Sequence, residues 1–352
     1  MTNVIEHMVH NVAEWLLGKG KDSDIIISSR ARLARNLQNI PFIDRASEDQ
    51  QKEVLSTVLL AAENAPLLKD VYFFNVSSME KQKRLFFVER RLISMDFAER
   101  ENPRGVLVTP NERVGVMINE EDHLRIQVIC SGFSLLEAWH EIRRLDEELS
   151  GDLNYAFSER FGYLTACPTN VGTGVRFSVF IHLPVLTFKK EIEGVFAETI
   201  PTGIAVRGFY GEGSKVIGNF FQISNQYTLG WTEQGILDRI IPIIRRFITQ
   251  ERKARQQIMK DQRIVIEDKI FRALGILSKA RILTSMEFLD LISALRLGSD
   301  LGIIPEIDTK LFNELMVVTQ PAHIQGLEGK TLDEIERDIL RASLVRKKLN
   351  LN

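Results

Sequence analysis

The spacing of apolar residues changes near residue 232, and this change constrains the fold more than any other feature of the sequence. Before it, short apolar runs typical of strands are interspersed with helical patterns. After Thr232 the apolar spacing is helical almost throughout. We therefore expect a mixed region built on a sheet, followed by an all-helical region. The expected strands are 25–27, 71–76, 84–88, 105–108, 114–118, 124–130, 177–181, 203–207 and 216–224, and the expected helices before residue 232 are 4–17, 47–60, 134–149 and 185–195.

Helix-start signals and one charged segment divide the chain further. A serine or threonine followed three residues later by Glu or Gln, the capping-box pattern, occurs at Ser47, Ser134, Thr284 and Thr331. The charge-rich, helix-favouring stretch 250–263 is typical of a connection between two domains. We therefore predict an N-terminal helix within 1–21, a mixed domain over 22–250 and a helical C-terminal domain over 251–352.

The composition argues against several classes of function. A formal net charge of −2 over 352 residues provides no global positive field for nucleic acid, and the basic residues of 245–263 are interleaved with Glu251 and Asp261, as on a solvated helix face. Two cysteines, Cys130 and Cys167, are too few for a disulfide framework or a zinc site. We see neither an apolar run of about 20 residues that could span a membrane nor a signal-peptide pattern. We expect a cytoplasmic protein that contacts neither membrane nor nucleic acid directly.

Three consecutive carboxylates, Glu120, Glu121 and Asp122, lie between two predicted strands in the segment 119–125, which reads NEEDHLR. Burying like charges side by side is costly unless they are paired. One interpretation is a solvated acidic loop that joins the strands. The other is a clamp for a cationic group. His123 beside the carboxylates is expected to be structural.

Five arginines flank loops that contain glycine or serine, or lie on predicted strands. They are Arg30, Arg32, Arg125, Arg176 and Arg207. Arg30 and Arg32 are two residues apart after the apolar run 25–27, so in a strand their side chains point to the same face. Taken singly, each could be an ordinary surface charge. As a set they favour phosphate binding, because a guanidinium holds phosphate oxygens with two hydrogen bonds and never loses its charge.

Four segments carry a resemblance to a known family. They read SSRARLAR (28–35), NEEDHLR (119–125), CPTNVGTGVR (167–176) and RGFYGEG (207–213). In this order they resemble the ATP:guanidino phosphotransferase family, which includes arginine and creatine kinases. The resemblance implies an α+β catalytic domain with a glutamine-synthetase-like antiparallel sheet flanked by helices. It also implies ATP as phosphoryl donor, with Mg²⁺ bridging the nucleotide oxygens and no metal site built from protein side chains alone.

The resemblance assigns roles to individual residues. Glu121 and Glu212 are expected to hold the substrate guanidinium, and Cys167 matches the family's reactive cysteine. Arg91 stands where relatives often have a histidine that contacts the nucleotide. The implied ATP-binding residues are Ser28, Ser29, Arg30, Ala31, Arg32, Arg91, Arg125, Arg176, Phe177, Ser178, Val179, Phe180, Arg207, Gly208, Phe209, Tyr210, Gly211 and Glu212.

The arrangement of the chain is similar to one branch of this family, the bacterial protein-arginine kinases. Only a short helix precedes Ser28, and a helical extension follows the catalytic domain. Residues 337–342 read RDILRA and fit a motif, RDxxRA, that binds phosphoarginine allosterically in that branch. We expect Arg337, Asp338, Arg341 and Ala342 to form this site. On a helix starting at Thr331, Leu332, Ile335 and Ile339 are then expected to face inward. The other interpretation is a surface ion pair between Asp338 and Arg341.

The resemblance predicts a kinase that phosphorylates arginine side chains of proteins during protein quality control and stress. It implies protein substrates with accessible arginines, a homodimer formed through the C-terminal domain, a zinc-binding activator of the McsA type and Clp protease machinery as partners. Two alternatives stay open at this point: a kinase for free arginine or another small guanidino compound, and a non-catalytic adaptor that binds phosphoarginine.

Overall fold

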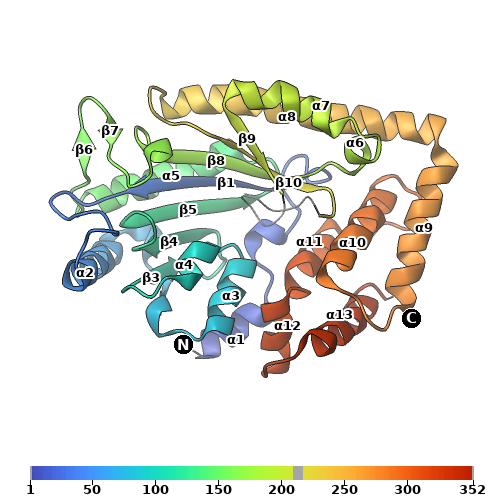
Figure 1. The fold of residues 1–352 in the computed structure, drawn as a ribbon, viewed down its shortest axis with the longest axis horizontal. Helices are drawn as coiled ribbons and strands as arrows, with labels where there is room; N and C mark the ends of the chain where they lie inside the picture. Colours follow the sequence, from blue (N-terminus) through green and yellow to red (C-terminus); the bar gives the residue numbers. More distant parts are fainter. Residues whose placement is uncertain (1, 209–216, 351–352) are drawn as a thin grey trace.

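The computed structural model describes residues 2–208 and 217–350. Within these ranges eight strands form one antiparallel sheet in the order β2-β3-β4-β5-β1-β8-β10-β9 (Figure 1). The strands are β1 (Ile26–Arg35), β2 (Tyr72–Asn75), β3 (Gly105–Val108), β4 (Val114–Ile118), β5 (Leu124–Ser131), β8 (Val175–His182), β9 (Ile204–Arg207) and β10 (Phe220–Asn225), and β6 (Phe157–Ser158) pairs with β7 (Gly162–Tyr163) in a separate hairpin. The expected antiparallel sheet flanked by helices is confirmed.

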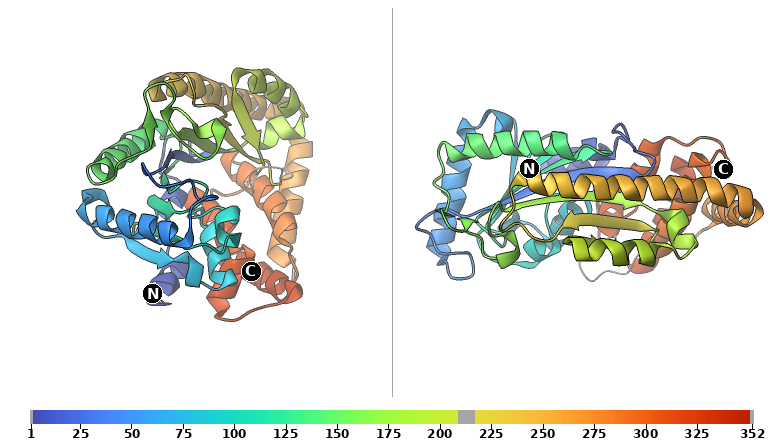
Figure 2. Two further views of the ribbon diagram at one scale, coloured as in Figure 1. Left: turned by 60° about the vertical axis from the view of Figure 1, so that its left-hand side comes forward. Right: turned by 90° about the horizontal axis from the view of Figure 1, so that it is seen from above.

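Helices cover one face of the sheet and build the C-terminal part of the chain. Helices α5 and α8 pack against strands β1, β5, β8 and β10, and α8 runs along much of the length of the molecule (Figure 2). The helices are α1 (Thr2–His10), α2 (Glu48–Asn64), α3 (Lys81–Glu89), α4 (Met95–Glu99), α5 (Leu135–Ser150), α6 (Pro184–Phe188), α7 (Ile192–Thr199), α8 (Glu233–Asp261), α9 (Arg263–Lys279), α10 (Ser285–Asp300), α11 (Thr309–Val318), α12 (Pro321–Glu328) and α13 (Glu334–Lys348).

The central strands have two chemically different faces, as side chains alternate along a strand. On β1, Ala31 and Leu33 are buried in the core against the helices, whereas Arg30 and Arg32 are only partly buried on the opposite face. On β8, Phe177 is fully buried on the helical side, with its ring edge-on to Trp139 of α5 at 5.6 Å between centroids. The helices therefore leave one face of the sheet available for polar chemistry.

Three predictions of secondary structure differ from the structure. Residues 84–88 lie in helix α3 rather than in a strand, because Phe86 and Phe87 are both buried, and helical spacing carries them onto Phe74 and His323. A short apolar run cannot by itself distinguish the two structures. The predicted helix 4–17 is two elements, α1 and a 3₁₀ turn at Glu14–Leu16. The predicted helix 185–195 is likewise divided between α6 and α7.

The predicted helix-capping hydrogen bonds form at some of the predicted sites and not at others. Ser47 forms the full capping box with Gln50, and the hydroxyl of Thr284 accepts a hydrogen bond from the backbone N–H of Glu287. Ser134 makes no such bond, because its hydroxyl donates to the carbonyl of Ser131 instead. Helix α13 begins at Glu334, with a capping box between Asp333 and Glu336 rather than at Thr331.

The orientation of α13 differs from the prediction. Ile335 and Ile339 are 64% and 45% exposed, while Asp338, Arg341 and Ala342 are buried. The inward-facing assignment of the two isoleucines was therefore wrong, and Asp338 and Arg341 do not form a surface ion pair. The ion pair lies in the interior, where the carbonyl groups of Thr319 and Leu283 accept hydrogen bonds from Arg341, as described below.

The helical C-terminal part packs closely on the rest of the chain. Position 250, proposed as a boundary, lies within α8, and we retain 22–250 and 251–352 as a proposed division. The guanidinium of Arg296 donates to the carbonyl of Ser23 at 2.7 Å, and the amide of Asn313 donates to the carbonyl of Leu16 at 3.2 Å. In the part of the chain described, no helix is both long and apolar enough to cross a membrane.

A partly buried carboxylate joins the two parts. Glu89, the last residue of α3, accepts hydrogen bonds from the backbone N–H groups of Ala322 and His323 at 2.7 and 2.8 Å, at the start of α12. Burial raises the pKa of Glu89 from 4.5 to about 8, although these bonds and the positive charges of Arg341 and Arg337 act in the opposite direction.

This raised pKa predicts a pH dependence of stability. The folded protein retains a proton on Glu89 that the unfolded chain releases, so the contribution of Glu89 to stability is full below about pH 4.5 and is lost as the pH rises through about 8. In Glu89→Gln this loss is absent. Between pH 5 and pH 9 we expect the melting temperature of wild type to fall relative to Glu89→Gln by a few degrees, equivalent to about 1 kcal/mol or more. Parallel pH profiles for wild type, Glu89→Gln and the exposed control Glu53→Gln would contradict this assignment.

Candidate active site

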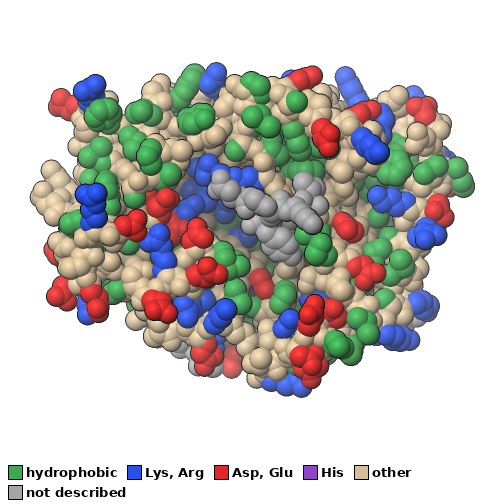
Figure 3. Space-filling view, in the orientation of Figure 1, with side chains coloured by type: hydrophobic (Ala, Val, Ile, Leu, Met, Phe, Trp, Pro, Cys, Tyr) green, Lys and Arg blue, Asp and Glu red, His purple; other side chains and the backbone are tan. Residues whose placement is uncertain are grey.

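The face of the sheet that the helices leave open carries the arginines singled out in the sequence. In the strand register Arg32 of β1 lies opposite Arg176 of β8, and Ala34 lies opposite Arg125 of β5. Arg207, at the end of β9, lies opposite Gln222 of β10. The structure thus brings together five arginines that are far apart in the sequence, and a group of basic side chains gathers at the centre of this face (Figure 3).

The positive charges of the arginines repel one another. Burial, followed by the positive charges of Arg91, Arg125, Arg176 and Arg207, lowers the pKa of Arg30 to about 9. Burial and the charges of Arg30, Arg125 and Arg176 also lower the pKa of Arg32 well below its usual value, against the attraction of Glu120. Guanidinium groups keep their charge in proteins, so burial and mutual repulsion both disfavour the charged cluster. A bound polyanion would offset this repulsion.

Glu120 partly balances the cluster. Its carboxylate accepts hydrogen bonds from Nη1 of Arg125 at 2.5 and 2.6 Å and from the hydroxyl of Ser94 at 2.5 Å, and it is only 3% exposed. Burial alone would raise the pKa of Glu120, but Arg125, Ser94 and Arg32 lower it to about 2. Glu120 therefore stays ionised and orients Arg125. The sequence identified the carboxylate but not its partner, because Ser94 lies 26 residues away along the chain.

Glu121 has a different environment from its neighbour. It is only partly buried, and burial together with repulsion from Asp122 and Glu120 raises its pKa, against the attraction of Arg125. A carboxylate whose negative charge is disfavoured by its neighbours gains from a cationic ligand and can accept a proton. Of the three consecutive carboxylates, Glu121 is thus the one suited to holding a guanidinium beside the arginine cluster.

Asp122 and His123 fix the backbone around the site. The carboxylate of Asp122 accepts hydrogen bonds from Nδ2 of Asn36 at 2.6 Å and from the backbone N–H of Ala166 at 2.7 Å. Nδ1 of His123 accepts from the backbone N–H of Leu37 at 2.9 Å, so its other nitrogen donates to the carbonyl of Pro41. His123 is structural, as predicted.

Asp122 also positions the segment that contains Cys167. This cysteine directly follows Ala166 and is partly exposed, and its Sγ lies 3.1 Å from the hydroxyl of Thr169. Cys130, in contrast, is buried in the core, as predicted, and burial raises the pKa of its thiol to about 12.

The contacts of Asp122 lead to a test. In Asp122→Ala the amide of Asn36 and the N–H of Ala166 lose their buried acceptor, which costs about 1–3 kcal/mol of unfolding free energy. We also expect faster alkylation of Cys167 by iodoacetamide, since its segment is no longer held. Denaturant unfolding and mass-spectrometric alkylation rates measure both effects. An alkylation rate equal to that of wild type would show that Asp122 does not hold the Cys167 segment.

Arg91 enters the same site from the end of α3. Its backbone is in the left-handed region, with φ of 61°, which turns the chain after the helix. Its guanidinium lies 4.2 Å from the ring centre of Phe180 and 5.8 Å from that of Trp15, and its charge acts on Arg30. Arg91, at the position where relatives often have a histidine, therefore lies in the site. Trp15 was not predicted to be a site residue.

Some predicted nucleotide-binding residues do not face the site. Ser29, Ala31, Phe177 and Val179 are almost completely buried, and strand alternation places their side chains on the helical side of the sheet. We therefore no longer propose that the side chains of these four residues contact a nucleotide. Only the backbone groups of these residues can face it. Ser28, Ser178 and Phe180 are on the same face as Arg30. Gly208 follows Arg207, whereas Phe209, Tyr210, Gly211 and Glu212 lie outside the described residues.

The predicted phosphoarginine-binding residues form a compact buried group on α13. Nε of Arg341 donates to the carbonyl of Thr319 at 2.8 Å and Nη1 donates to the carbonyl of Leu283 at 2.7 Å, while Asp338 pairs with the same guanidinium. Arg337 donates to the carbonyl of Leu332 at 2.9 Å, and its charge, like that of Arg341, acts on Glu89.

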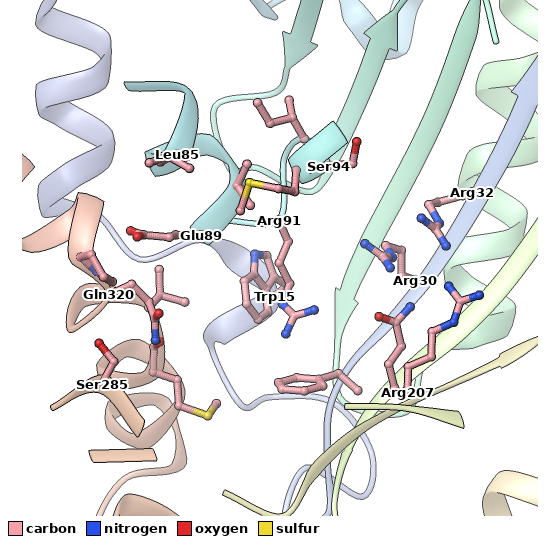
Figure 4. Close-up of a pocket in the computed structure, with 18 residues that line it drawn as sticks. Trp15, Arg30, Arg32, Leu85, Glu89, Arg91, Ser94, Arg207, Ser285 and Gln320 are labelled. Carbon is pink, nitrogen blue, oxygen red and sulfur yellow. The ribbon is translucent and has the colours of Figure 1, made fainter. Parts of the chain in front are cut away.

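A cleft of about 610 Å³ opens over the arginine face (Figure 4). Arg30, Arg32, Arg91 and Arg207 line one part of it. The described residues contain no group of three His, Cys, Asp or Glu that could hold a metal ion, so a Mg²⁺ ion would be held mainly by phosphate oxygens, as is usual at nucleotide sites. The arginines fit a polyphosphate, and Glu121 fits a cationic acceptor beside it.

The fold and this site define an enzyme of the phosphotransferase class, which passes a phosphoryl group from a polyphosphate to a cationic acceptor. Residues 53–254 match the family model described as ATP:guanido phosphotransferase, C-terminal catalytic domain. The chain belongs to the ATP:guanido phosphotransferase family. Residues 263–352 match a second model, described as the protein-arginine kinase McsB C-terminal domain.

Relatives and solved structures agree with this assignment. Proteins named protein-arginine kinase are 44% identical in Halothermothrix orenii, with 97% of both chains covered, and 40% identical in Bacillus subtilis, with 99% of this chain and 96% of that one covered. Lombricine kinase has a TM-score of 0.58 at 21% identity, covering 67% of this chain and 68% of that one. The duplicated taurocyamine kinase of Schistosoma mansoni has a TM-score of 0.56 at 24% identity, covering 69% and 36%. At these identities the two structures establish a shared fold.

Proposed function

We propose that this protein is a protein-arginine kinase, which transfers the γ-phosphoryl group of ATP to arginine side chains of other proteins. The observation that carries the proposal is the position of Glu121 beside a cluster of mutually repelling arginines on the open face of the sheet. The full-length similarity to proteins named protein-arginine kinase supports arginine in proteins as the acceptor.

In the proposed reaction the arginines bind and neutralise the phosphate chain. Arg30, Arg32, Arg125, Arg176 and Arg207 contact the phosphates and hold the γ-phosphorus in line with the acceptor nitrogen. A Mg²⁺ ion bound with the nucleotide would supply further positive charge to the phosphates. The acceptor guanidinium is a poor nucleophile because its pKa exceeds about 12.

Glu121 makes this nitrogen reactive by fixing the plane of the guanidinium and accepting a proton as the N–P bond forms. The bond between the γ-phosphorus and the β–γ bridging oxygen breaks, and ADP leaves. We assign Glu212 the same orienting role and place Cys167 beside the acceptor, both by resemblance to the family.

The acceptor distinguishes the proposal from its alternatives. A kinase for free arginine would use the same phosphate-binding residues. An adaptor that only binds phosphoarginine needs positive charge for a single phosphoryl group, whereas five arginines from four strands meet on the open face and suit a polyphosphate, which favours an enzyme.

We further propose that the C-terminal region senses phosphoarginine and forms a homodimer. Arg337, Asp338, Arg341 and Ala342 would bind phosphoarginine, with the arginines contacting phosphate and Asp338 the guanidinium. Exposed apolar side chains support a self-association surface: Ile264 and Phe271 on α9 and Ile335 and Ile339 on α13. A cytoplasmic role in stress response and protein degradation, with a zinc-binding activator of the McsA type and Clp protease machinery as partners, stays a prediction from the resemblance.

Initial rates with the two acceptors test the proposal. The purified protein is given MgATP with either an unfolded arginine-rich protein or free arginine at the same concentration of guanidino groups, and ADP release is measured. We expect faster turnover with the protein acceptor. Faster turnover with free arginine would favour a small-molecule kinase, and phosphoarginine binding without turnover of either acceptor would favour the adaptor.

A further inference from the structure

A second groove lies at the β2 edge of the sheet, and it shares no lining residue with the cleft over the arginines. Its volume is about 570 Å³, and it is bounded by the start of α2, the end of β2 and the segment 101–103. Three side-chain amides line it, those of Gln51, Asn75 and Asn102, which we call the groove amides. The carboxylates of Glu48 and Glu101 lie in the same lining.

The groove amides have oxygens without hydrogen-bond donors. The side-chain oxygens of Gln51, Asn75 and Asn102 are buried, and none of the three has a hydrogen-bond partner among the described residues. Gln51 as a whole is only 8% exposed. Buried polar atoms in native proteins are nearly always hydrogen-bonded. Three unpartnered acceptors in one groove therefore indicate a place for a ligand that brings donors.

The amide nitrogens determine which way two of these side chains are turned. Nε2 of Gln51 donates to the carbonyl groups of Ile43 and Ala46 at 3.2 and 3.1 Å. Nδ2 of Asn102 donates to the carbonyl of Asn119 at 3.2 Å. Turning either amide over would place its oxygen against a carbonyl oxygen, which is also an acceptor. The unpartnered atoms are therefore oxygens, and they call for a donor.

The charged residues of the groove favour a cation. Lys52, which also lines the groove, forms an ion pair with Glu48 at 2.7 Å. Glu101 is exposed and forms no ion pair within the described part of the chain, so its negative charge is available at the rim. Ammonium and guanidinium groups carry three and five N–H donors and no acceptor. A lysine or arginine side chain thus matches both the charge and the unpartnered oxygens.

The groove adjoins the proposed acceptor site. Nδ2 of Asn119 donates to the carbonyl groups of Gln51 and Pro103, both at 2.8 Å. Glu121 follows Asn119 by two residues, so their Cα atoms lie at most about 7 Å apart. Arg100, next to Glu101 in the chain, is close enough for its charge to act on Glu121. A polypeptide with an arginine at Glu121 can therefore place a neighbouring side chain in the groove.

We propose that this groove binds a lysine or arginine side chain of the protein substrate, a few residues from the arginine that is phosphorylated. The inference rests on the proposed function and deepens it by naming a feature of the substrate. The donors of the bound side chain would meet the groove amides, and its charge would meet Glu101. An extended chain advances about 3.3 Å per residue, so we expect the second basic residue within about five residues of the acceptor. One molecule of free arginine cannot occupy both places.

A lysine scan of a peptide acceptor tests the proposal with the full-length protein. Each peptide has one arginine as acceptor, and lysine replaces glutamine at one position at a time within five residues on either side. Lysine carries the charge without a guanidino group. Glu101→Lys reverses the charge at the rim at an exposed position. Glu99→Lys makes the same change two residues away, at an exposed position outside the groove, and is the control.

We expect lysine at one or two positions to raise kcat/KM of wild type by about tenfold over the all-glutamine peptide, mainly through a lower KM. Glu101→Lys should lose this gain, whereas Glu99→Lys should keep it. A scan without any gain in wild type would overturn the proposal. A gain retained by Glu101→Lys would overturn it too, and so would an equal loss in Glu99→Lys, which would indicate long-range charge rather than the groove.

A binding measurement separates this inference from the proposed function. Fluorescence anisotropy of the labelled peptides should show tighter binding of the best lysine peptide than of the all-glutamine peptide to wild type. Transfer to all peptides alike, with equal affinities, would reject the groove and leave the proposed function standing. Absence of transfer to every peptide and to free arginine, with unequal affinities, would reject the proposed function and leave the groove.

Discussion

Glu121→Gln reduces the turnover number for phosphoryl transfer by roughly 10²–10⁴-fold and leaves the affinity for MgATP nearly unchanged. Glutamine keeps the size of the side chain and one hydrogen-bond acceptor, but it cannot accept a proton or offer a full negative charge to the acceptor guanidinium. The phosphate-binding arginines are untouched. Stopped assays of transfer and calorimetric titration with MgATP measure the two quantities separately.

The matched control is Glu99→Gln, an exposed carboxylate at the end of α4. We expect this variant to behave like wild type in both measurements. Transfer by Glu121→Gln at the wild-type rate would remove Glu121 from the mechanism. A parallel loss of MgATP affinity would mean that the substitution disturbs Arg125 and the phosphate site instead.

Arg32→Met changes activity and stability in opposite directions. Transfer falls by roughly 10³–10⁵-fold, the range found when a guanidinium that stabilises the transferring phosphoryl group is removed. In the absence of nucleotide, however, the melting temperature rises by a few degrees. The reason is that Arg32 is partly buried among other positive charges, and its Nε has no hydrogen-bond partner among the described residues.

Differential scanning fluorimetry with and without MgATP measures the change in stability. MgATP should raise the melting temperature of wild type more than that of Arg32→Met. Arg245→Met, on the exposed side of α8, is the control for loss of an arginine at the surface. A lower melting temperature for nucleotide-free Arg32→Met would show that the cluster is not electrostatically strained.

The sheet and the arginine site could be predicted where local patterns and the fold agree. The strands 105–108 and 114–118 have the predicted bounds, because each is a continuous apolar run between turn residues. Arg30 and Arg32 share a face because two-residue spacing in a strand dictates it. The same alternation places the side chains of Phe177 and Val179 on the helical side, where both are buried, so that only their backbone groups stay proposed as nucleotide contacts.

Other features depend on contacts between distant segments. Nothing near Glu120 in the sequence indicates that Ser94, 26 residues earlier in the chain, donates a hydrogen bond to its carboxylate. The burial of Asp338 and Arg341 requires the carbonyls of Thr319 and Leu283, and the start of α13 at Glu334 turns Ile335 and Ile339 outward. Likewise, α3 is helical because Phe86 and Phe87 find partners in β2 and α12.

The most direct test of the central claim is to locate the transferred phosphate. The protein is incubated with MgATP and an unfolded basic protein, and phosphosites are mapped at neutral pH, because the P–N bond is labile in acid. The proposed mechanism predicts phosphate on arginine side chains with wild type and none with Glu121→Gln. Phosphate on serine, threonine or histidine, or equal arginine phosphorylation by the two proteins, would contradict it.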